Sequence, residues 1–346
     1  MSKTYRVAVI GCGYIAQRSH MPAWHDEPRA SLAAVCDANR ARAELAAQHF
    51  NIENVYGDVG EMFDAEQLDV VDIATRPDSH LPLVQKAAER GLAILCQKPL
   101  ADSMDQAQQL VRVAEQHDVP LMVTENWRWL PMYRSARHYI EQGRIGRPYT
   151  ARIFASAMLR RENPVSSTQP YLAEMPRLVI FEMCIHWIDC LRAMFGNVRQ
   201  VFAQTRRVNP ALAGEDLARL MLTFDDGATA LIDVSWACPD VISPGEALRV
   251  EGERGALTVH NKSQKIFFNR FDSRMAEPLP ILPQADSFCL LHSHFIEQLD
   301  AGRRDFVTSG RDNLNTLAAV FAAYQSAETN QAVDVPTPVP ADAPPG

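Results

Sequence analysis

The sequence lacks the features typical of membrane, secreted and nucleic-acid-binding proteins. No apolar run approaches the roughly 20 residues that cross a bilayer, and the start, MSKTYRVAVIG, enters a strand without an apolar signal segment. Clusters of lysine and arginine with interleaved aromatics are also absent, and the formal net charge is -8. These absences predict a cytoplasmic protein that has neither a nucleic acid nor a membrane as a partner.

Cysteine pairs with the spacing of metal ligands are missing as well. The seven cysteines are an odd number, form no C-x-x-C motif and lie mostly inside apolar runs. We therefore expect reduced thiols that pack as small hydrophobic side chains, and no structural metal site. They are Cys12, Cys36, Cys96, Cys184, Cys190, Cys238 and Cys289.

The composition is that of an ordinary globular chain, and its 346 residues suffice for two domains. Up to residue 126, strands alternate with helices. Strands are expected near 5–10, 30–36, 68–74, 92–97 and 119–125, and helices near 14–26, 39–49, 79–90 and 103–117. This alternation predicts an α/β domain with a doubly wound parallel sheet, the Rossmann arrangement, over residues 1–126.

After residue 126 the strands follow one another in sequence. They are expected at 151–157, 199–208, 218–224, 229–237, 247–253, 255–261 and 265–271, with helices near 131–142, 178–195, 288–301 and 311–329. Turn signals at 225–227 and 253–255 favour hairpins, so we predict a second α/β domain, 127–332, with a mostly antiparallel sheet. The proline-rich tail, 333–346, is expected to be extended and solvated.

A glycine-rich turn follows the first strand. Gly11, Gly13 and Ala16 form a G-x-G-x-x-A pattern at the start of a helix, and Asp37 ends the second strand, 24 residues beyond Gly13. The glycines permit a tight turn and the approach of a pyrophosphate, while the carboxylate suits ribose hydroxyls and repels a 2′-phosphate. The pattern favours NAD over NADP; Arg40 could serve a 2′-phosphate, and an α/β domain without cofactor is the alternative.

A lysine stands at the end of the short apolar run LAILCQKPLA, residues 92–101. Such a run is typical of a strand buried on both faces, and Pro99 cannot continue a sheet ladder, so the strand must end at about Lys98. The carboxyl edge of a parallel sheet is where ligands bind. Lys98 is therefore a candidate site residue, although a lysine whose ammonium merely reaches water at a strand end would give the same pattern.

A stripe of ionisable residues interrupts the apolar segment VIFEMCIHWIDCLRAMFG, residues 179–196. Glu182, His186 and Asp189 fall within about 60° of one another around an ideal helix. Buried carboxylates need partners, so these groups are expected to meet each other, a cation or a polar ligand. A histidine with a neighbouring carboxylate suits proton transfer. A structural histidine and a metal site of E-x-x-x-H spacing are the alternatives.

With these motifs in this order, the chain resembles the glucose-fructose oxidoreductase and inositol dehydrogenase family, Gfo/Idh/MocA, from Arg6 to about Asn330. The resemblance implies a Rossmann domain joined to an open-faced α/β domain, and an NAD-dependent dehydrogenase acting on secondary hydroxyls of sugars or cyclitols. It implies that Lys98 donates to the reacting oxygen and that His186, held by Glu182, is the acid and base. A homodimer or homotetramer is expected, built on the outer sheet face that carries Leu231, Asp233 and Ser235.

The resemblance also implies the residues around the ligands. The TRPDSH loop, 75–80, matches the family's loop near the cofactor, and the ENWRW segment, 125–129, matches its crossover segment. The expected cofactor-binding residues are Gly11, Gly13, Tyr14, Ile15, Asp37, Arg40, Thr75, Arg76, His80, Gln97 and Asn126, and the expected substrate-binding residues are Arg128, Tyr171, Arg177 and Asp189.

Three positions depart from the family pattern. Gln97 replaces the usual glutamate, Glu182 the more common aspartate, and Arg177 stands near the start of a helix where many members have glycines. An arginine there opposes the helix dipole and needs a negative partner, either Glu174, Glu182 or an anionic substrate. A non-catalytic NAD- and sugar-binding regulator, and an NAD-dependent glycosidase that retains its cofactor, are the alternative functions.

Overall fold

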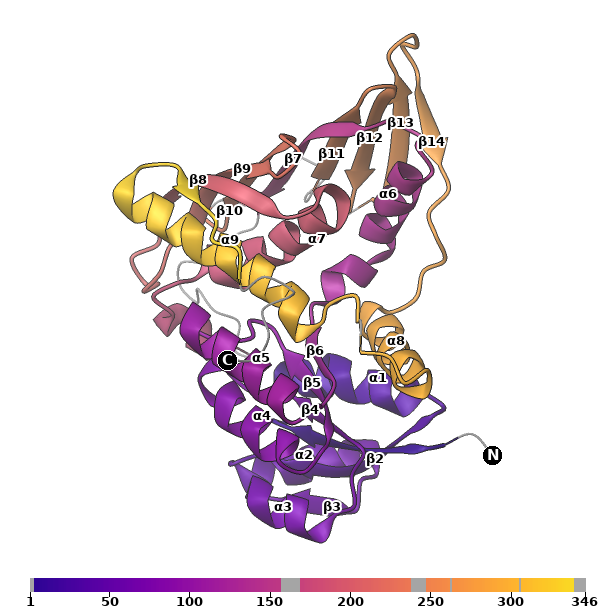
Figure 1. Cartoon of the computed structure of the whole chain (residues 1–346), viewed down its shortest axis with the longest axis vertical. Helices are drawn as coiled ribbons and strands as arrows, with labels where there is room; N and C mark the ends of the chain where they lie inside the picture. The colour runs from indigo at the N-terminus through magenta and orange to yellow at the C-terminus, as the bar shows by residue number, and fades with distance from the viewer. Residues whose placement is uncertain (1–2, 157–168, 238–246, 262, 305, 339–346) are drawn as a thin grey trace. The chain divides into compact units, whose positions relative to one another are not determined.

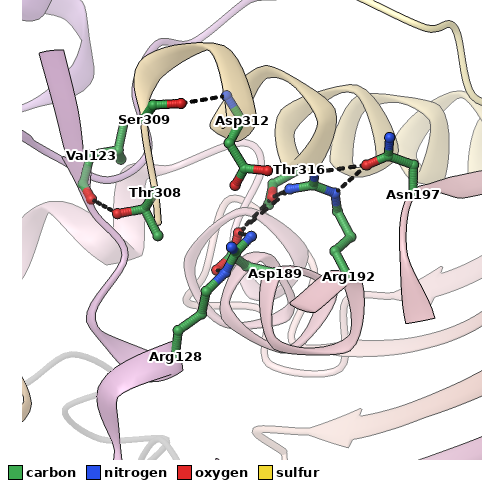
Figure 2. A network of polar contacts seen from close by, with 9 residues as sticks. All are labelled: Val123, Arg128, Asp189, Arg192, Asn197, Thr308, Ser309, Asp312 and Thr316. Atoms are coloured by element: carbon green, nitrogen blue, oxygen red, sulfur yellow. Dashed lines mark hydrogen bonds and ion pairs between the residues drawn. The ribbon is translucent and has the colours of Figure 1, made fainter. Parts of the chain in front are cut away.

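The computed structural model describes residues 3–156, 169–237, 247–261, 263–304 and 306–338 (Figure 1). The chain forms two compact units, one of Met1–Asn126 with Ala285–Leu314 and the other of Trp127–Gln284 with Asn315–Gly346. The segment 285–314, which the sequence assigned to the second domain, therefore lies in the first unit. A hydrogen bond holds the segment 285–314 to the rest of the first unit. Thr308 Oγ1 donates to the Val123 carbonyl at 2.7 Å (Figure 2).

The first unit contains the predicted parallel sheet, with six strands in the order β3-β2-β1-β4-β5-β6. The strands are β1 Tyr5–Ile10, β2 Ala30–Cys36, β3 Asn54–Tyr56, β4 Val70–Ile73, β5 Ala93–Gln97 and β6 Leu121–Thr124. The central strands β4 and β5 are buried along their whole length, as continuous apolar runs require. Strand β3 was not predicted, because three half-buried residues carry no readable periodicity.

Helices complete the first unit. They are α1 Met21–Asp26, α2 Arg40–Phe50, α3 Val59–Ala65, α4 His80–Ala88, α5 Met104–Gln116 and α8 Ser287–Asp300, with a 3₁₀ turn at Pro77–Ser79. The glycine-rich turn leads first into a π-helical turn, Ala16–His20, and only then into α1. The rings of Trp24 in α1 and His292 in α8 meet edge to face, with centroids 4.5 Å apart, so α8 packs on α1.

The second unit contains a nine-stranded sheet in the order β14-β13-β12-β11-β7-β10-β9-β8-β15. The strands are β7 Pro148–Ser156, β8 Val198–Arg206, β9 Leu217–Phe224, β10 Thr229–Ser235, β11 Ala247–Gly252, β12 Gly255–His260, β13 Lys265–Arg270, β14 Ala276–Leu279 and β15 Val333–Asp334. Pairing is antiparallel except between β7 and β10. The mixed α/β class and the mostly antiparallel second sheet are thus confirmed.

One face of this second sheet is apolar and buried, while the other is open. In β10, Ile232 and Val234 are buried, whereas Leu231 is 41% exposed. The helices of the second unit are α6 Pro131–Glu141, α7 Ile185–Phe195 and most of α9 Gly310–Thr329, with 3₁₀ turns at Asn126–Trp129 and Pro170–Glu174 and a π-helical turn at Ile180–Cys184. At the start of the proline-rich tail, the extended residues Val333–Asp334 form β15 and pair with β8.

Six cysteines of the described residues are free thiols, and all but the half-buried Cys289 are buried. Cys238 lies outside the described residues. Among the helices that the structure describes, none combines the length and the apolar character needed to cross a membrane.

Candidate active site

The glycine-rich turn leaves space for a dinucleotide. Gly11 has a φ of +92°, and a Cβ there would lie 2.8 Å from the Ala74 carbonyl oxygen, so only glycine fits. At Gly13, by contrast, an added Cβ would meet nothing within 4 Å, and this open space is where a pyrophosphate can approach the backbone. Tyr14 and Ile15 follow directly, before the π-helical turn that begins at Ala16. The cradle fits NAD.

Asp37 lies beside this turn and is only 8% exposed. Its Oδ2 accepts a hydrogen bond from the Cys12 N–H and its Oδ1 one from the Asn39 N–H, each at 2.8 Å. The arginine nearest to it is Arg42, whose Nη1 is 3.5 Å from Oδ2, while the predicted Arg40 pairs with Glu44 at 3.1 Å. Arg42, which the sequence analysis did not single out, lies in the first turn of α2 together with Arg40.

The TRPDSH loop is braced by His80, which is fully buried. Its Nδ1 lies 3.0 Å from the Leu100 carbonyl oxygen and its Nε2 lies 3.2 Å from the Thr75 carbonyl oxygen. Burial lowers the pKa of His80. Ser79 Oγ donates to Thr75 Oγ1 at 2.8 Å, and Arg76 is exposed in the loop. His80 thus shapes the loop, and the predicted contacts of these residues with the cofactor stay predictions.

Lys98 follows directly on the last residue of β5 and is half-buried, between the buried Gln97 and the buried Pro99. Its backbone N–H donates to Gln97 Oε1 at 2.6 Å. The side chain of Gln97 therefore fixes the backbone at the point where the chain leaves the sheet. In the same unit, Asn126 Nδ2 donates to Ser287 Oγ at 2.9 Å. An ammonium is therefore set at the carboxyl edge of the parallel sheet, where ligands bind.

The stripe in the second unit is divided between two kinds of helix. Glu182 lies in the π-helical turn and is half-buried, whereas His186 lies in α7 and is 5% exposed. In a π-helical turn the hydrogen bonds run from i to i+5, so the ideal α-helical angles assumed from the sequence do not hold across it. The imidazole of His186 stacks on the indole of Trp127, with ring centroids 4.6 Å apart and planes 4° from parallel.

Asp189 is fully buried and pairs with a guanidinium (Figure 2). Arg128 donates to it through both Nε, at 2.5 Å, and Nη2, at 2.7 Å, and Thr316 Oγ1 donates at 2.8 Å. Arg192 Nη1 lies 3.7 Å away and donates to Thr316 Oγ1 at 2.7 Å. The cation expected for this carboxylate is thus Arg128, and a bidentate pair of this kind fixes the plane of the guanidinium.

Glu215, which the sequence analysis missed, holds the start of the π-helical turn. It is 8% exposed and accepts hydrogen bonds from the N–H groups of Leu178 and Ile180 at 3.0–3.2 Å. Tyr324 also donates to it, at 2.7 Å, and burial with the nearby carboxylate raises the pKa of Tyr324. A carboxylate at a helix start is favourable. No local pattern marks Glu215, because it lies 35 residues beyond the turn it holds.

Arg177, which precedes the π-helical turn Ile180–Cys184, contacts two aromatic rings of α9. Its guanidinium carbon lies 5.3 and 5.4 Å from the ring centroids of Phe321 and Tyr324 in α9, which is the range of cation–π contacts. Tyr171 lies in the 3₁₀ turn Pro170–Glu174, and its hydroxyl accepts a hydrogen bond from Gln169 Nε2 at 3.3 Å. That Tyr171, Arg177, Arg128 and Asp189 contact substrate stays a prediction.

Comparison with known proteins identifies both units. Residues 5–125 match the profile described as "Oxidoreductase family, NAD-binding Rossmann fold", and residues 133–258 match the "GFO/IDH/MocA C-terminal domain". D-apiose dehydrogenase of Paraburkholderia graminis is 39% identical over 96% of this chain and 90% of its own length. D-apiose dehydrogenase of Rhizobium rhizogenes is 37% identical, over 95% and 96%.

Solved structures agree with these matches. An oxidoreductase from Agrobacterium radiobacter, crystallised in complex with NAD+, L-tartaric acid and magnesium, superposes with a TM-score of 0.89. It is 34% identical in sequence, and the match covers 96% of this chain and 99% of that one. Levoglucosan dehydrogenase in complex with NADH and levoglucosan superposes with a TM-score of 0.87 at 21% identity, over 97% and 100%, which shows a shared fold.

Proposed function

The chain belongs to the Gfo/Idh/MocA oxidoreductase family, and on this premise we propose that it oxidises a hydroxyl group of a sugar or cyclitol, with D-apiose as the first candidate. The NAD-binding domain together with the two relatives named as dehydrogenases makes it an NAD-dependent dehydrogenase that acts on CH–OH groups. The substrate is proposed from the two relatives named D-apiose dehydrogenase, which match the chain along nearly its whole length.

The cofactor would be held by the turn and the carboxylate of the first unit. The open backbone at Gly13 leaves room for the pyrophosphate, and Asp37 accepts from the adenosine ribose hydroxyls and repels a 2′-phosphate. The bound dinucleotide would supply hydride transfer to and from the carbon that carries the substrate hydroxyl. Titration with both dinucleotides tests the preference, because equal or tighter binding of NADP would contradict the role of Asp37.

The chemistry of the substrate oxygen is assigned to three side chains. Lys98 donates a hydrogen bond to this oxygen, and His186 takes the hydroxyl proton on a ring nitrogen, while Glu182 orients the imidazole. The observation that carries this assignment is the half-buried Lys98, anchored through its N–H at the carboxyl end of β5. Stacking on Trp127 supports the role of His186, because it restrains the plane of the ring that must receive the proton.

Arg128 is assigned to the substrate as well. Its side chain is 8% exposed and its Nε and Nη2 atoms are engaged by Asp189, so the guanidinium has a fixed orientation. Holding the guanidinium in one orientation beforehand lowers the entropy cost of recognising the hydroxyl oxygens of a polyol. Asp189 then acts through Arg128 and needs no contact of its own with the substrate.

The test replaces the two catalytic side chains and follows NADH absorbance with D-apiose, other sugars, polyols and L-tartrate. Lys98→Met and His186→Asn should each lower turnover about 10²-fold or more, while NAD affinity changes little. The exposed Lys86→Met and His25→Asn are matched controls that should keep full turnover. Wild-type turnover in both catalytic variants would refute the mechanism, and sugar binding without any NAD reduction would favour the regulator.

Assembly through the open face of the second sheet is part of the proposal. Phe154, Met221 and Leu231 are 44%, 54% and 41% exposed on this face, and Leu231 pairs directly with Met221 across β9 and β10. Adjacent apolar residues of this kind mark an interaction surface. Light scattering should give a dimer or tetramer at micromolar concentration and a smaller mass for Leu231→Lys. A monomeric wild type would contradict the assignment.

A further inference from the structure

A line of hydrogen bonds joins a buried carboxylate of the first unit to the backbone of Lys98. His20 Nδ1 lies 2.8 Å from Asp72 Oδ2, and His20 Nε2 lies 2.9 Å from Gln97 Nε2. Gln97 Oε1 in turn accepts from the Lys98 N–H at 2.6 Å. His20 and Asp72 are fully buried and Gln97 is 7% exposed, so the line from Asp72 to Gln97 is shielded from water.

The chemistry of the four groups fixes the position of each proton along this line. The Lys98 N–H can only donate, so the atom of Gln97 that faces it is the amide oxygen, and the amide NH2 faces His20. His20 Nε2 must then accept, which leaves the imidazole proton on Nδ1, where it is donated to the Asp72 carboxylate. Every donor is matched to an acceptor when His20 is neutral.

A glutamate at position 97 could not complete the same line. Its carboxylate offers only acceptors, so His20 would need protons on both ring nitrogens to serve Asp72 and position 97 together. Such an imidazolium would lie between two buried carboxylates, beside the ammonium of Lys98. Gln97, which departs from the family pattern, thus replaces two charges with two neutral hydrogen bonds.

The surroundings of His20 reinforce the neutral arrangement. Trp24 Nε1 donates to Asp72 Oδ2 at 2.7 Å, and the ring of Phe288 lies 5.0 Å from that of His20. His292 Nδ1 faces the Phe288 carbonyl oxygen at 2.7 Å. Burial lowers the pKa of His292, which favours the uncharged form of this neighbouring ring.

Two other ionisable groups lie close to this line. His292 Nε2 is 3.5 Å from Asp72 Oδ2, and Cys96 in β5 has a buried thiol whose pKa burial raises well above its usual value. His20, Asp72 and His292 could in principle hold a metal ion. Two N–H groups, from Trp24 and His20, already point at Asp72 Oδ2 within 2.8 Å, and this donor set suits a carboxylate without a metal.

We propose that Gln97 and His20 are positioning residues for Lys98, and that Gln97 selects the neutral form of His20 with its proton on Nδ1. The line from Asp72 holds the strand end at a fixed place and direction without adding a charge beside the ammonium. This inference rests on the role assigned to Lys98 in the proposed function. It extends that role to side chains that act on Lys98 through its backbone N–H.

The first test reads the proton on His20 directly, without catalysis. Nitrogen NMR of ¹⁵N-histidine-labelled protein distinguishes a protonated from an unprotonated ring nitrogen, and the His20 signals are those that disappear in His20→Gln. We expect Nδ1 protonated and Nε2 unprotonated at pH 7, and both nitrogens protonated in Gln97→Glu. A proton on Nε2 of His20 in the wild type would overturn the inference and leave the proposed function intact.

The second test reads the consequence for turnover. Gln97→Glu should lower kcat roughly 10-fold, change KM for the sugar little, and add an ionisation to the pH profile of kcat, because the line then carries a titrating imidazolium. His20→Gln should lower kcat without adding that ionisation. The control is His292→Gln, which removes a neighbour of Asp72 outside the line and should keep both kcat and its pH profile.

The outcomes separate the two ideas. If Lys98→Met keeps full turnover, the proposed function fails, yet the NMR result still decides the arrangement of protons. If Gln97→Glu and His292→Gln alter kcat and its pH profile alike, the effect is general destabilisation and the positioning role is refuted. Should Gln97→Glu not fold, the wild-type NMR spectrum and the kinetics of His20→Gln still test the inference.

Discussion

Asp72 in the first unit and Asp189 in the second are both fully buried, but they are compensated in different ways. Asp72 accepts from an imidazole and an indole N–H, within a cluster that has no arginine or lysine at hydrogen-bond distance among the described residues. Asp189 accepts from the guanidinium of Arg128 in a bidentate pair, with Arg192 3.7 Å away.

The difference shows what each carboxylate is used for. A bidentate ion pair orients a cation, and in the second unit this cation, Arg128, is the group assigned to the substrate. Hydrogen bonds from uncharged groups orient a backbone without adding a second charge, and in the first unit this backbone carries Lys98. A cation beside Asp72 would repel the Lys98 ammonium. In the second unit, by contrast, the positive charge of Arg128 is itself the group assigned to the substrate.

The largest effect is expected from Asp189→Asn. It leaves the guanidinium of Arg128, 8% exposed, without its counter-charge, and removing one partner of a buried ion pair typically costs about 3–5 kcal/mol. The free energy of unfolding, measured by chemical denaturation, should fall by this amount. The exposed Asp225→Asn is the control and should change little. A loss below about 1 kcal/mol would show that Asp189 does not hold a desolvated charge.

Asp72→Asn should have a smaller effect on the same measurement. Its main donors are uncharged, and the asparagine retains one oxygen, so the loss corresponds to unsatisfied hydrogen bonds, about 1–3 kcal/mol. If Asp72→Asn destabilises the protein as much as Asp189→Asn does, the two carboxylates are not compensated in different ways. That result would indicate a charged imidazole beside Asp72 and would also contradict the neutral line to Lys98.

Acid should weaken the first unit through its buried histidines. Burial lowers the pKa of both His80 and His292, so the unfolded chain takes up protons below about pH 6.5 that the folded chain does not. Stability should therefore be complete above this pH and decline below it, by at most about 1.4 kcal/mol per pH unit for each histidine.

Denaturation curves between pH 7.5 and 5 check this dependence. His292→Gln should remove up to half of the slope, and the exposed His25→Asn should keep all of it. An unchanged slope in His292→Gln would mean that this imidazole is already charged in the folded protein. The lowered pKa of Asp72 adds a further loss only below about pH 4, where the unfolded carboxyl takes up its proton.

The smallest effect is expected at Arg177, whose charge lies over Phe321 and Tyr324. Because the side chain is exposed, the contact is worth about 0.5–1 kcal/mol, and Arg177→Ala should lower stability by no more. Activity on neutral and anionic polyols distinguishes its two roles. An equal change on both substrates would exclude recognition of an anion, whereas a selective loss on the anion would place Arg177 with Arg128.

The sequence by itself determined the elements that depend on local pattern. The glycine-rich turn with Asp37 at the end of β2, the buried strand that ends at Lys98, and the alternation of Ile232 and Val234 with Leu231 all agree with the structure. These features could be predicted because backbone sterics, strand periodicity and the missing N–H of proline act over a few residues.

Only the tertiary structure decided which side chains meet. His20, Asp72 and His292 come from three distant parts of the chain, and α8, expected in the second domain, belongs to the first unit. The π-helical turns before α1 and α7 alter helical spacing without a sequence signal. A buried charge needs a compensating partner, and the sequence shows this need for Asp189. Which residue becomes the partner, here Arg128, depends on how distant segments pack in the folded chain.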